Sequence, residues 1–426
     1  MTKEEIFNLI EEEDVEFIRL QFTDIFGNLK NLAVTPGQMD KVLLNRYRID
    51  GTAMFGGKYS YEEDLYLYPQ TDSFVILPWR PQQGKVAKML CDVYNPDGTE
   101  FAMSPRSVLK RVLREAGDSG YTFFVDPECE FFLFHTNENG TPTTVTHEQA
   151  GFMDVGPADF GENARRDIVL TLEQLGFEIE SSHHEKAPAQ HEIDFKEAEA
   201  GVMADSIMTF RFAVRSIAKR FGLYATFMPK PKSDVAGSGM HLSIAMLKDG
   251  KNLFGSEDGT VTKYADYFMG GIMAHAEGLC AVTNPIVNSY KRLLTGFDAP
   301  KDISWSRLGE KAMLRLDRSV DDTKVELRFP DSAANPYLAI ALCIAAGMDG
   351  IRNGISAGPE LAEVQAAKPL PGTLKKAVEA FMADPLLVSV MGEELSRIYT
   401  EAKLSEWNSY MKQVSDWELE TYLGKM

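Results

Sequence analysis

The segment PECEFFLF, residues 127–134, places Glu128 and Glu130 inside an otherwise apolar run. Successive side chains of a β-strand point to opposite faces, so the two acids share one face and Cys129 takes the other. Two carboxylates on a core-like strand carry a large desolvation cost unless cations meet them. The segment therefore favours a strand that lines a cation-binding site.

The same alternation recurs in two other apolar segments. Glu326 and Arg328 share a face in KVELRF, and Glu192 and Asp194 share one in HEIDF. For any one of these strands, an acidic face turned to solvent explains the pattern as well as a cation site does. It explains all the strands together poorly. Like charges that converge from several strands call for divalent cations, and two ions suit this number of acids better than one.

The identity of the metal stays open at this point. The segment HHEKAPAQHEIDF, residues 183–195, contains three histidines, which suggest zinc, and three acids, which suggest Mg²⁺ or Mn²⁺. In AGSGMHLS, Gly237 and Gly239 allow the backbone to approach a ligand closely, and His241 follows at the start of a predicted strand. A lone histidine of this kind is more often structural than a ligand.

A further segment, NSYKRLLTGFDAP, places Lys291 and Arg292 before a glycine-containing loop that ends in Asp298. The pattern is typical of an anion clamp with a mobile flap, although a surface turn has the same spacing.

Composition restricts the class of protein. A chain of 426 residues is too long for one ordinary core and predicts two domains. Its net charge of −19 argues against nucleic acid and against anionic membrane surfaces as partners. The 4 cysteines show no CxxC spacing, which favours a reducing, cytoplasmic location. The N-terminus lacks the pattern of a signal peptide, and the apolar run at 337–348 is too short to span a bilayer and predicts a buried helix.

The order of elements predicts an α+β fold. A helix is expected at 3–12, followed by strand-like runs with turns at DIFGN and NPDG. Ser104 and Pro105 have the pattern of a helix start, so we place the boundary there, with an N-terminal domain at 1–104 and a second domain at 105–426. No predicted strand is followed by a dinucleotide-binding or P-loop glycine motif.

Six segments, PECEFF, HHEKAPAQHEIDF, FMPKP, GSGMH, NSYKRL and VELRFPDSAANPYL, occur in this order along almost the whole chain. Together they resemble bacterial type I glutamine synthetase. The resemblance implies a β-grasp-like N-terminal domain and a catalytic half-barrel domain. It also implies a homo-oligomer, a dodecamer of two hexameric rings, in which each active site is shared between the N-terminal domain of one subunit and the C-terminal domain of its neighbour.

The resemblance implies roles for individual residues. Each active site would bind ATP as co-substrate and two or three Mg²⁺ or Mn²⁺ ions. The implied ligands are Glu130, Glu185 and Glu192 for one ion, and Glu128, His241 and Glu326 for a second. The implied substrate-binding residues are Glu130, Gly237, Arg292 and Arg328, and the implied nucleotide-binding residues are His184, Ser243, Arg315 and Lys324. The implied catalytic residues are Asp50, donated by the neighbouring subunit, Asp298, Arg292 and Arg328.

The chain departs from the family pattern near the amine and phosphate sites. Ala53 and Phe152 stand where the family usually has a serine and a tyrosine, so two hydroxyls near the ammonium are missing. Asp298 is a shortened flap glutamate, Ala236 replaces an asparagine, and Glu310 falls where an arginine is usual. We expect Glu310 to weaken transition-state stabilisation unless a neighbouring cation compensates.

Two regulatory features of the family are not expected here. The segment 356–371 lacks the longer loop that carries the adenylylated tyrosine of some members. Tyr59 stands where Gram-positive-type enzymes carry an arginine that senses glutamine.

The function implied by the resemblance is ATP-dependent ligation of ammonia to the γ-carboxylate of glutamate through γ-glutamyl phosphate, which forms glutamine. A glutamate ligase for another small amine is the main alternative, because Ala53 and Phe152 make the amine pocket less polar and larger. A non-catalytic regulatory relative is a third possibility, motivated by Glu310, Ala236 and Asp298. The six intact metal-binding candidates argue against it.

Overall fold

The computed structural model describes residues 1–57, 59–80, 83–255, 260–309, 311–318, 323–363 and 366–425. The N-terminal part folds around a mixed sheet with the strand order β2-β1-β6-β4-β3, in which β5 pairs with β6. Its elements are α1 (Lys3–Glu12), β1 (Val15–Thr23), β2 (Leu29–Val34), α2 (Met39–Leu43), β3 (Tyr47–Asp50), β4 (Asp64–Pro69), β5 (Val75–Ile76) and β6 (Lys85–Tyr94). The helix predicted at 3–12 is confirmed.

The predicted hairpin at DIFGN joins β1 to β2. Asp24 accepts hydrogen bonds from the backbone N–H groups of Phe26 and Asn28, at 3.0 and 2.9 Å. Gly27 has φ +83° and lies against Asn335, so both its backbone conformation and the space around it favour glycine. The turn therefore follows from its local sequence and also packs against the C-terminal part of the chain.

The C-terminal part contains a sheet of ten described strands, with β15-β16-β17-β12-β7-β9-β8 as its main path. The strands on this path are β7 (Thr122–His135), β8 (Ile179–His184), β9 (Gln190–Phe195), β12 (Met240–Lys248), β15 (Trp305–Ser306), β16 (Leu314–Arg318) and β17 (Thr323–Leu327). The remaining three are β10 (Ala198–Glu199), β11 (Leu223–Thr226) and β13 (Lys251–Asn252), and β14 (Asp302–Ile303) pairs with β18 (Lys368–Pro369) separately. The α+β class is confirmed.

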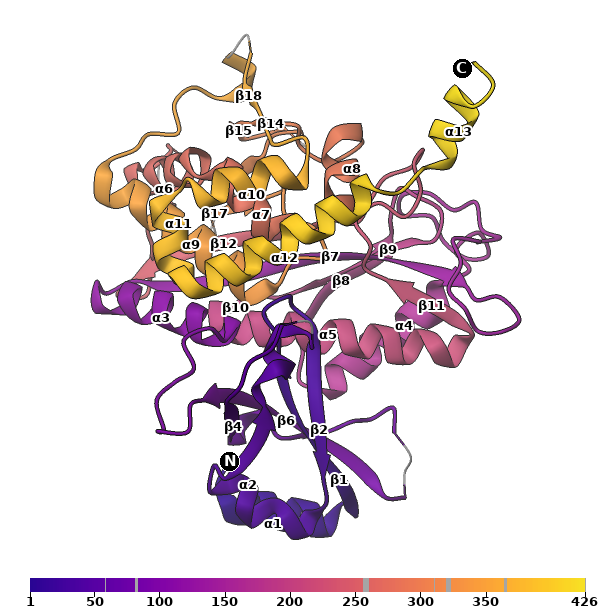
Figure 1. Cartoon of the computed structure of the whole chain (residues 1–426), viewed down its shortest axis with the longest axis vertical. Helices are drawn as coiled ribbons and strands as arrows, with labels where there is room; N and C mark the ends of the chain where they lie inside the picture. The colour runs from indigo at the N-terminus through magenta and orange to yellow at the C-terminus, as the bar shows by residue number, and fades with distance from the viewer. Residues whose placement is uncertain are drawn as a thin grey trace.

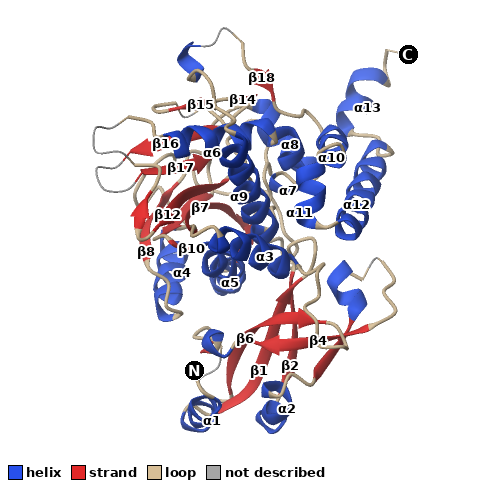
Figure 2. Ribbon diagram, turned by 90° about the vertical axis from the view of Figure 1, so that its left-hand side faces the viewer, coloured by secondary structure: helices blue, strands red, loops and turns tan. Residues whose placement is uncertain are grey.

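The C-terminal part also contains helices, most of which lie on one face of the large sheet (Figure 2), while the last one projects away from it (Figure 1). They are α3 (Pro105–Asp118), α4 (Glu162–Gln174), α5 (Ala200–Ala218), α6 (Lys263–Ala274), α7 (Ala276–Thr283), α8 (Val287–Thr295), α9 (Pro336–Asn353), α10 (Leu374–Met382), α11 (Pro385–Met391), α12 (Glu393–Met411) and α13 (Asp416–Tyr422). The apolar run predicted to be a buried helix is α9. Among the described residues, no helix has the length and apolar character needed to cross a bilayer.

Strand β7 separates the core from the acidic face. Phe131 packs on Phe210 of α5, and Phe123 packs on Phe268 of α6, each at 6.0 Å between ring centroids. Glu128 and Glu130 lie between these aromatic residues in sequence, so the alternation of side chains turns both acids to the opposite face. The predicted parity of this strand therefore holds.

The two sheets are joined by a polar seam between β6, α3 and α5. Arg106 of α3 forms ion pairs with Asp92 of β6 and with Asp205 of α5, the latter at 2.8 Å. The buried Lys88 of β6 donates to Thr209 of α5 at 2.9 Å. Figure 1 shows the N-terminal sheet standing below the helices, apart from the centre of the large sheet.

Candidate active site

The acidic face is assembled by strand register. Glu128 of β7 lies opposite His241 of β12 on one side and opposite Asp194 of β9 on the other. Glu130 lies opposite Glu192 of β9 in the same way. Cross-strand neighbours have closely spaced side chains on one face of a sheet, so this register gathers the acids that the sequence places far apart.

One group, which we call the His241 cluster, consists of Glu128, His241 and Glu326. Nδ1 of His241 lies 2.8 Å from a Glu128 oxygen and 3.4 Å from a Glu326 oxygen. Glu326 is fully buried between two guanidinium groups, those of Arg315 and Arg328, each at 2.5 Å. The chain thus supplies this cluster with two cations of its own.

These neighbours decide the protonation of the cluster. Burial by itself raises the pKa of Glu128, but the hydrogen bond and charge of His241, with the charges of Arg328 and Arg315, lower it to about 2. Burial and the charge of Arg328 lower the pKa of His241. At neutral pH the cluster therefore offers an ionised carboxylate beside a neutral imidazole, the forms that ligate metals.

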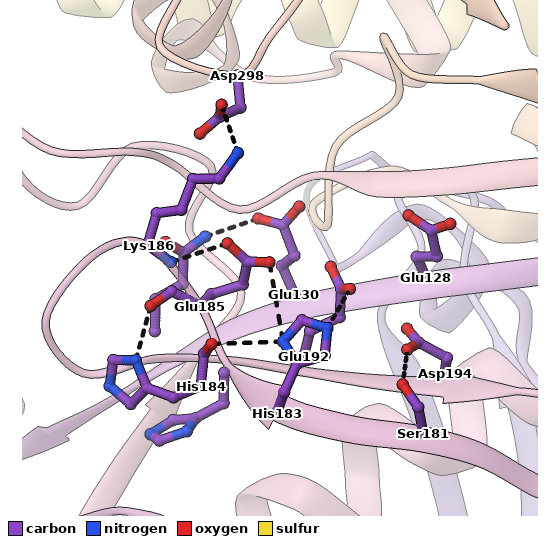
Figure 3. A network of polar contacts seen from close by, with 12 residues as sticks. Glu128, Glu130, Ser181, His183, His184, Glu185, Lys186, Glu192, Asp194 and Asp298 are labelled. Atoms are coloured by element: carbon purple, nitrogen blue, oxygen red, sulfur yellow. Dashed lines mark hydrogen bonds and ion pairs between the residues drawn. The ribbon is translucent and has the colours of Figure 1, made fainter. Parts of the chain in front are cut away.

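The second group, which we call the Glu185 cluster, consists of His183, Glu185 and Glu192. His183 lies 3.2 Å from a Glu192 oxygen and 3.9 Å from a Glu185 oxygen. Figure 3 shows Glu130 beside this group, with Glu185 reaching in from the loop between β8 and β9. The sequence-predicted ligands Glu130, Glu185 and Glu192 therefore lie together, and His183 joins them.

The Glu185 cluster is short of positive charge. Burial raises the pKa of Glu185 to about 7, with the charge of Glu130 adding to the effect. Burial, Glu130 and Asp194 raise the pKa of Glu192 well above its usual value. Burial also raises the pKa of Glu130, although Arg292 opposes it. Such acids fit a hard divalent cation, which would offset their repulsion and take oxygen ligands.

A small pocket adjoins both clusters. It is lined by Glu130, Lys230, Gly237, His241, Arg292, Thr295, Phe297, Asp298 and Ala299. A side chain at Gly237 would lie 2.1 Å from the carbonyl oxygen of Pro229, and one at Gly239 would lie 2.7 Å from Arg292. Both positions therefore require glycine, since the GSG loop passes close to the backbone and the side chains of the site. A larger cavity, of about 1160 Å³, is lined mainly by β1, the β1–β2 hairpin, α5 and α12, and none of the acids of the two clusters lines it.

The predicted substrate cations occupy different positions. Arg292 of α8 is buried and donates to the carbonyl oxygens of Phe329, Pro330 and Arg328, at 3.0, 3.3 and 3.1 Å. Its guanidinium group is thus held rigidly at the pocket. Arg328 instead pairs with Glu326, as described above.

Three of the four predicted nucleotide-binding residues lie on the strands around Glu326 of the His241 cluster. Ser243 of β12 lies opposite Glu326 of β17, and Arg315 of β16 lies opposite the same glutamate. Lys324 pairs with Glu197 at 2.9 Å and with Asp126 at 3.4 Å. These side chains therefore form a row of polar groups across β12, β17 and β16.

His184, the fourth predicted nucleotide-binding residue, has no exposed surface. Its Nε2 lies 2.8 Å from Glu148, and its Nδ1 lies 2.6 Å from the carbonyl oxygen of Glu185. Both ring nitrogens are therefore occupied within the protein. This geometry favours a role in shaping the loop that carries Glu185.

Two other predicted residues lie at the edge of the site, and a third lies apart from it. Asp298, in the flap after α8, forms an ion pair with Lys186 at 2.8 Å (Figure 3). Phe152 packs edge-on against His183, at 5.5 Å between ring centroids. Asp50 is exposed at the end of β3 in the N-terminal sheet, and it accepts a hydrogen bond from the backbone N–H group of Thr52 at 2.8 Å.

The departures from the family pattern have unequal structural consequences. Ala236 is buried in a small apolar cluster with Phe132, Phe134, Ala187 and Ala189. Ala53 is half-buried in the short 3₁₀ helix Gly51–Phe55. Glu310 lies outside the described residues, so the prediction made for it has no structural counterpart.

Sequence reasoning missed two supporting residues. Gln190 donates to Glu130 at 2.6 Å and to the carbonyl oxygen of Gly237 at 3.2 Å, so it links β9 to the GSG loop. Glu148 accepts from His184 and from the backbone of Phe160 at 3.0 Å. Gln190 stood inside a recognised motif, but Glu148 lies in an irregular loop with no periodic signal.

The group Glu148, Asp159, His184 and His191 also has donor atoms close together. Arg165 already lies within it, 2.7 Å from Asp159 and 2.8 Å from Nδ1 of His191. A guanidinium group in this position makes the group a buried ion-pair network and not a further metal centre.

Comparisons with known proteins agree along the whole chain. Residues 14–96 match the glutamine synthetase beta-grasp domain, and residues 102–422 match the glutamine synthetase catalytic domain. A glutamine synthetase of Clostridium saccharobutylicum is 49% identical, with 100% of this chain and 99% of the relative covered. A glutamine synthetase of Staphylococcus aureus strain Mu50 is 44% identical, with 99% and 98% covered.

Solved structures give the same result. GmaS in complex with ADP superposes with a TM-score of 0.89 at 32% identity, covering 98% of this chain and 99% of that one. Apo GmaS without ligand superposes with a TM-score of 0.88 at the same identity. The sequence motifs, the two-domain fold and the paired acidic clusters thus lead to one conclusion: the chain belongs to the glutamine synthetase family.

Proposed function

We propose that the protein joins ammonia to the γ-carboxylate of glutamate at the expense of ATP, forming glutamine, ADP and phosphate. The observation that carries this proposal is the pair of acidic clusters on one sheet face, with the buried Arg292 between them and the flap. Both reacting groups, a carboxylate and a triphosphate, are anions, so the site must offset their repulsion while it aligns them. The clusters and the guanidinium groups suit that task.

The two clusters would hold divalent cations, which we propose to be Mg²⁺ or Mn²⁺. Each active site would bind two or three of these ions in total. The ligands would be Glu130, Glu185 and Glu192 for one ion, and Glu128, His241 and Glu326 for another. When bound, the ions supply positive charge that orients the phosphates and stabilises their developing charge. His183 lies close enough to Glu185 and Glu192 to fix the orientation of these carboxylates.

We assign the small pocket to glutamate. Arg292 would bind the substrate carboxylate, and Gly237 would offer its backbone at close range, with Glu130 as an acceptor for the substrate amino group. Arg328 and Arg315 would face the transferred phosphoryl group, with Ser243 and Lys324 further along the nucleotide path. GmaS, a structural relative, forms a complex with ADP, which supports a nucleotide as one of the ligands of this protein.

The amide forms in two steps. The γ-carboxylate oxygen first attacks the terminal phosphorus of ATP, and ADP leaves. The amine nitrogen then attacks the acyl carbon of γ-glutamyl phosphate, the carbon–oxygen bond to phosphate breaks, and a carboxylate removes the proton from nitrogen. We propose that Asp50 of the neighbouring subunit accepts that proton. Asp298, in the flap, would cover the intermediate.

A second candidate function is ligation of glutamate to another small amine. Phe152 carries no hydroxyl, its ring is 50% exposed, and it packs on His183 next to the Glu185 cluster. With an apolar ring at this position, the site accommodates an alkyl group on the amine better than it would with a tyrosine.

The experiment uses purified full-length protein with ATP, Mg²⁺ or Mn²⁺, glutamate and a panel of amines, following ADP and amide product by mass spectrometry. Product with ammonium and not with larger amines supports the main proposal. A preference for an alkylamine or polyamine replaces it with the second candidate. Absence of amide with every amine would identify a non-catalytic member of the family.

Further features are proposed on the same basis. We place the domain boundary between residues 104 and 105, where α3 begins. We also propose a homo-oligomer, a dodecamer, because Asp50 is exposed on its own domain and needs another subunit's site to act in. The acidic composition and the 4 unpaired cysteines support a cytoplasmic protein without nucleic acid or membrane partners.

A further inference from the structure

Lys186 connects three segments that surround the candidate amine site. Its backbone N–H group donates to Glu185 at 2.8 Å. Its ammonium group pairs with Asp298 in the flap at 2.8 Å and lies 5.6 Å from the centre of the Phe152 ring. Figure 3 shows this side chain rising from the loop between β8 and β9, above Glu185, to meet the flap.

The flap also contacts a second lysine, on the side of the GSG loop. It leaves α8 at Gly296, whose φ of +61° reverses the chain, and Phe297 is 45% exposed. Lys230 lies 4.2 Å from the centre of the Phe297 ring, on the side of the GSG loop. Two lysines therefore contact adjacent flap residues, and the Lys186 contact links the flap to the loop that carries Glu185.

We propose that Lys186 is a positioning residue that holds the flap over the glutamate pocket through its ion pair with Asp298. The shortened acid of the flap reaches the opposite wall because a lysine extends to meet it. Since the pocket is lined by Phe297, Asp298 and Ala299, displacement of these residues opens it to solvent. This role rests on the proposed ligase function.

Flap closure matters for the fate of the acyl phosphate. If water reaches this intermediate, its oxygen attacks the acyl carbon, the bond to phosphate breaks, and glutamate and phosphate are released without an amide. The net reaction is then hydrolysis of ATP. A flap held by Lys186 excludes water and keeps amide and ADP formation in one-to-one ratio.

The first test measures hydrogen exchange of the flap amides, residues 296–299, in the ligand-free full-length protein. Lys186→Met should accelerate exchange about two- to fivefold, the range that a partly exposed ion pair supplies. Lys186→Arg should keep the slower exchange, because it preserves the pair. In an Asp298→Asn background, Lys186→Met should cause no further acceleration, since the partner is already gone.

The second test measures amide formed per ADP at saturating ammonium. Lys186→Met should lower this ratio below one, and Lys186→Arg should restore it. Lys196→Met is the matched control, because it removes one lysine from an exposed pair with Glu178 on the same sheet. The control should change neither the ratio nor flap exchange.

The outcomes separate the two proposals. Unchanged flap exchange in Lys186→Met, or equal acceleration with and without Asp298, overturns the role of Lys186 whether or not the enzyme makes glutamine. Altered exchange in a protein that forms no amide with any amine supports the flap contact while overturning the proposed function. An unchanged product ratio in an active Lys186→Met enzyme also overturns the role.

Discussion

The His241 cluster and the Glu185 cluster face the same side of one sheet, yet the chain supplies them with very different charges. Glu326 lies between Arg315 and Arg328, whereas Glu185 and Glu192 lie beside further acids. The first cluster is therefore balanced before any ligand binds. In the second, carboxylates repel one another, and protonation or a bound cation relieves that repulsion. The comparison predicts that equivalent substitutions in the two clusters have opposite effects on stability.

The largest expected effect is the difference in stability between a variant of Glu326 and a variant of Glu192. Glu326→Gln leaves two guanidinium groups without their buried carboxylate and should destabilise the metal-free protein by about 3–5 kcal/mol. Glu192→Gln removes a repelling acid and should leave stability unchanged or raise it. Urea unfolding in the presence of a chelator measures both, and both variants should lose ligase activity. Equal destabilisation by the two substitutions would contradict the comparison.

Metal binding should stabilise the protein mainly through the Glu185 cluster. Burial and Glu130 raise the pKa of Glu185 from 4.5 to about 7, so the folded protein keeps a proton that the unfolded chain loses. In the metal-free protein, this group's contribution to stability therefore falls as pH rises from about 4.5 to 7. Mg²⁺ must displace that proton and should bind more tightly at pH 8 than at pH 6.

The measurement is thermal unfolding against Mg²⁺ concentration at the two pH values. At a hundredfold excess over Kd, the ion should add about 2.7 kcal/mol to the free energy of unfolding. Glu185→Gln should weaken the response and remove much of its pH dependence. A response independent of pH in the wild type would show that Glu185 is not among the ligands.

A substitution in the buried network of Glu148 and His184, behind Glu185, should have a smaller effect. Glu148→Gln weakens the contact with His184, whose other nitrogen bonds to the backbone of Glu185. We expect a loss of about 10- to 100-fold in metal affinity or activity, as for residues that orient metal ligands. Isothermal titration with Mn²⁺ gives the affinity. Glu178→Gln, at an exposed position, serves as the control and should have wild-type affinity.

The smallest expected effect concerns the amine. Phe152→Tyr restores a hydroxyl beside the Glu185 cluster and should lower the KM for ammonium by about two- to tenfold, the gain from one hydrogen bond. The KM for glutamate should not change. Phe160→Tyr, at a 61% exposed position in the same loop region, is the control. A raised KM for ammonium would indicate that the hydroxyl obstructs the amine site.

Much of the fold and of the acidic face was predictable because both depend on local periodicity. The alternation in PECEFFLF correctly turned Glu128 and Glu130 away from the aromatic core, and the apolar run after Asn335 became helix α9. Such patterns report which face of an element is buried. They do not report which residue of another element lies opposite.

The remaining contacts depend on long-range register and on loops. Arg315 neighbours Glu326 because β16 and β17 pair, and Lys186 meets Asp298 across 112 positions of sequence. Glu148 reaches His184 from an irregular segment that has no periodic pattern. Side-chain length, strand pairing and loop path decide these contacts together, so no local rule predicts them.

Residue type and strand alternation alone indicated a site of several carboxylates with a glycine loop and a flap, whereas the set of six metal-binding candidates, with Glu185 in a loop, followed from the family resemblance. Tertiary structure decided the distribution of charge among them. It surrounded Glu326 with arginines, left Glu185 and Glu192 against other acids, buried His184 and placed Lys186 on the flap. The reason is physical, because pKa values and ion pairs depend on distances between residues that only the folded chain brings together.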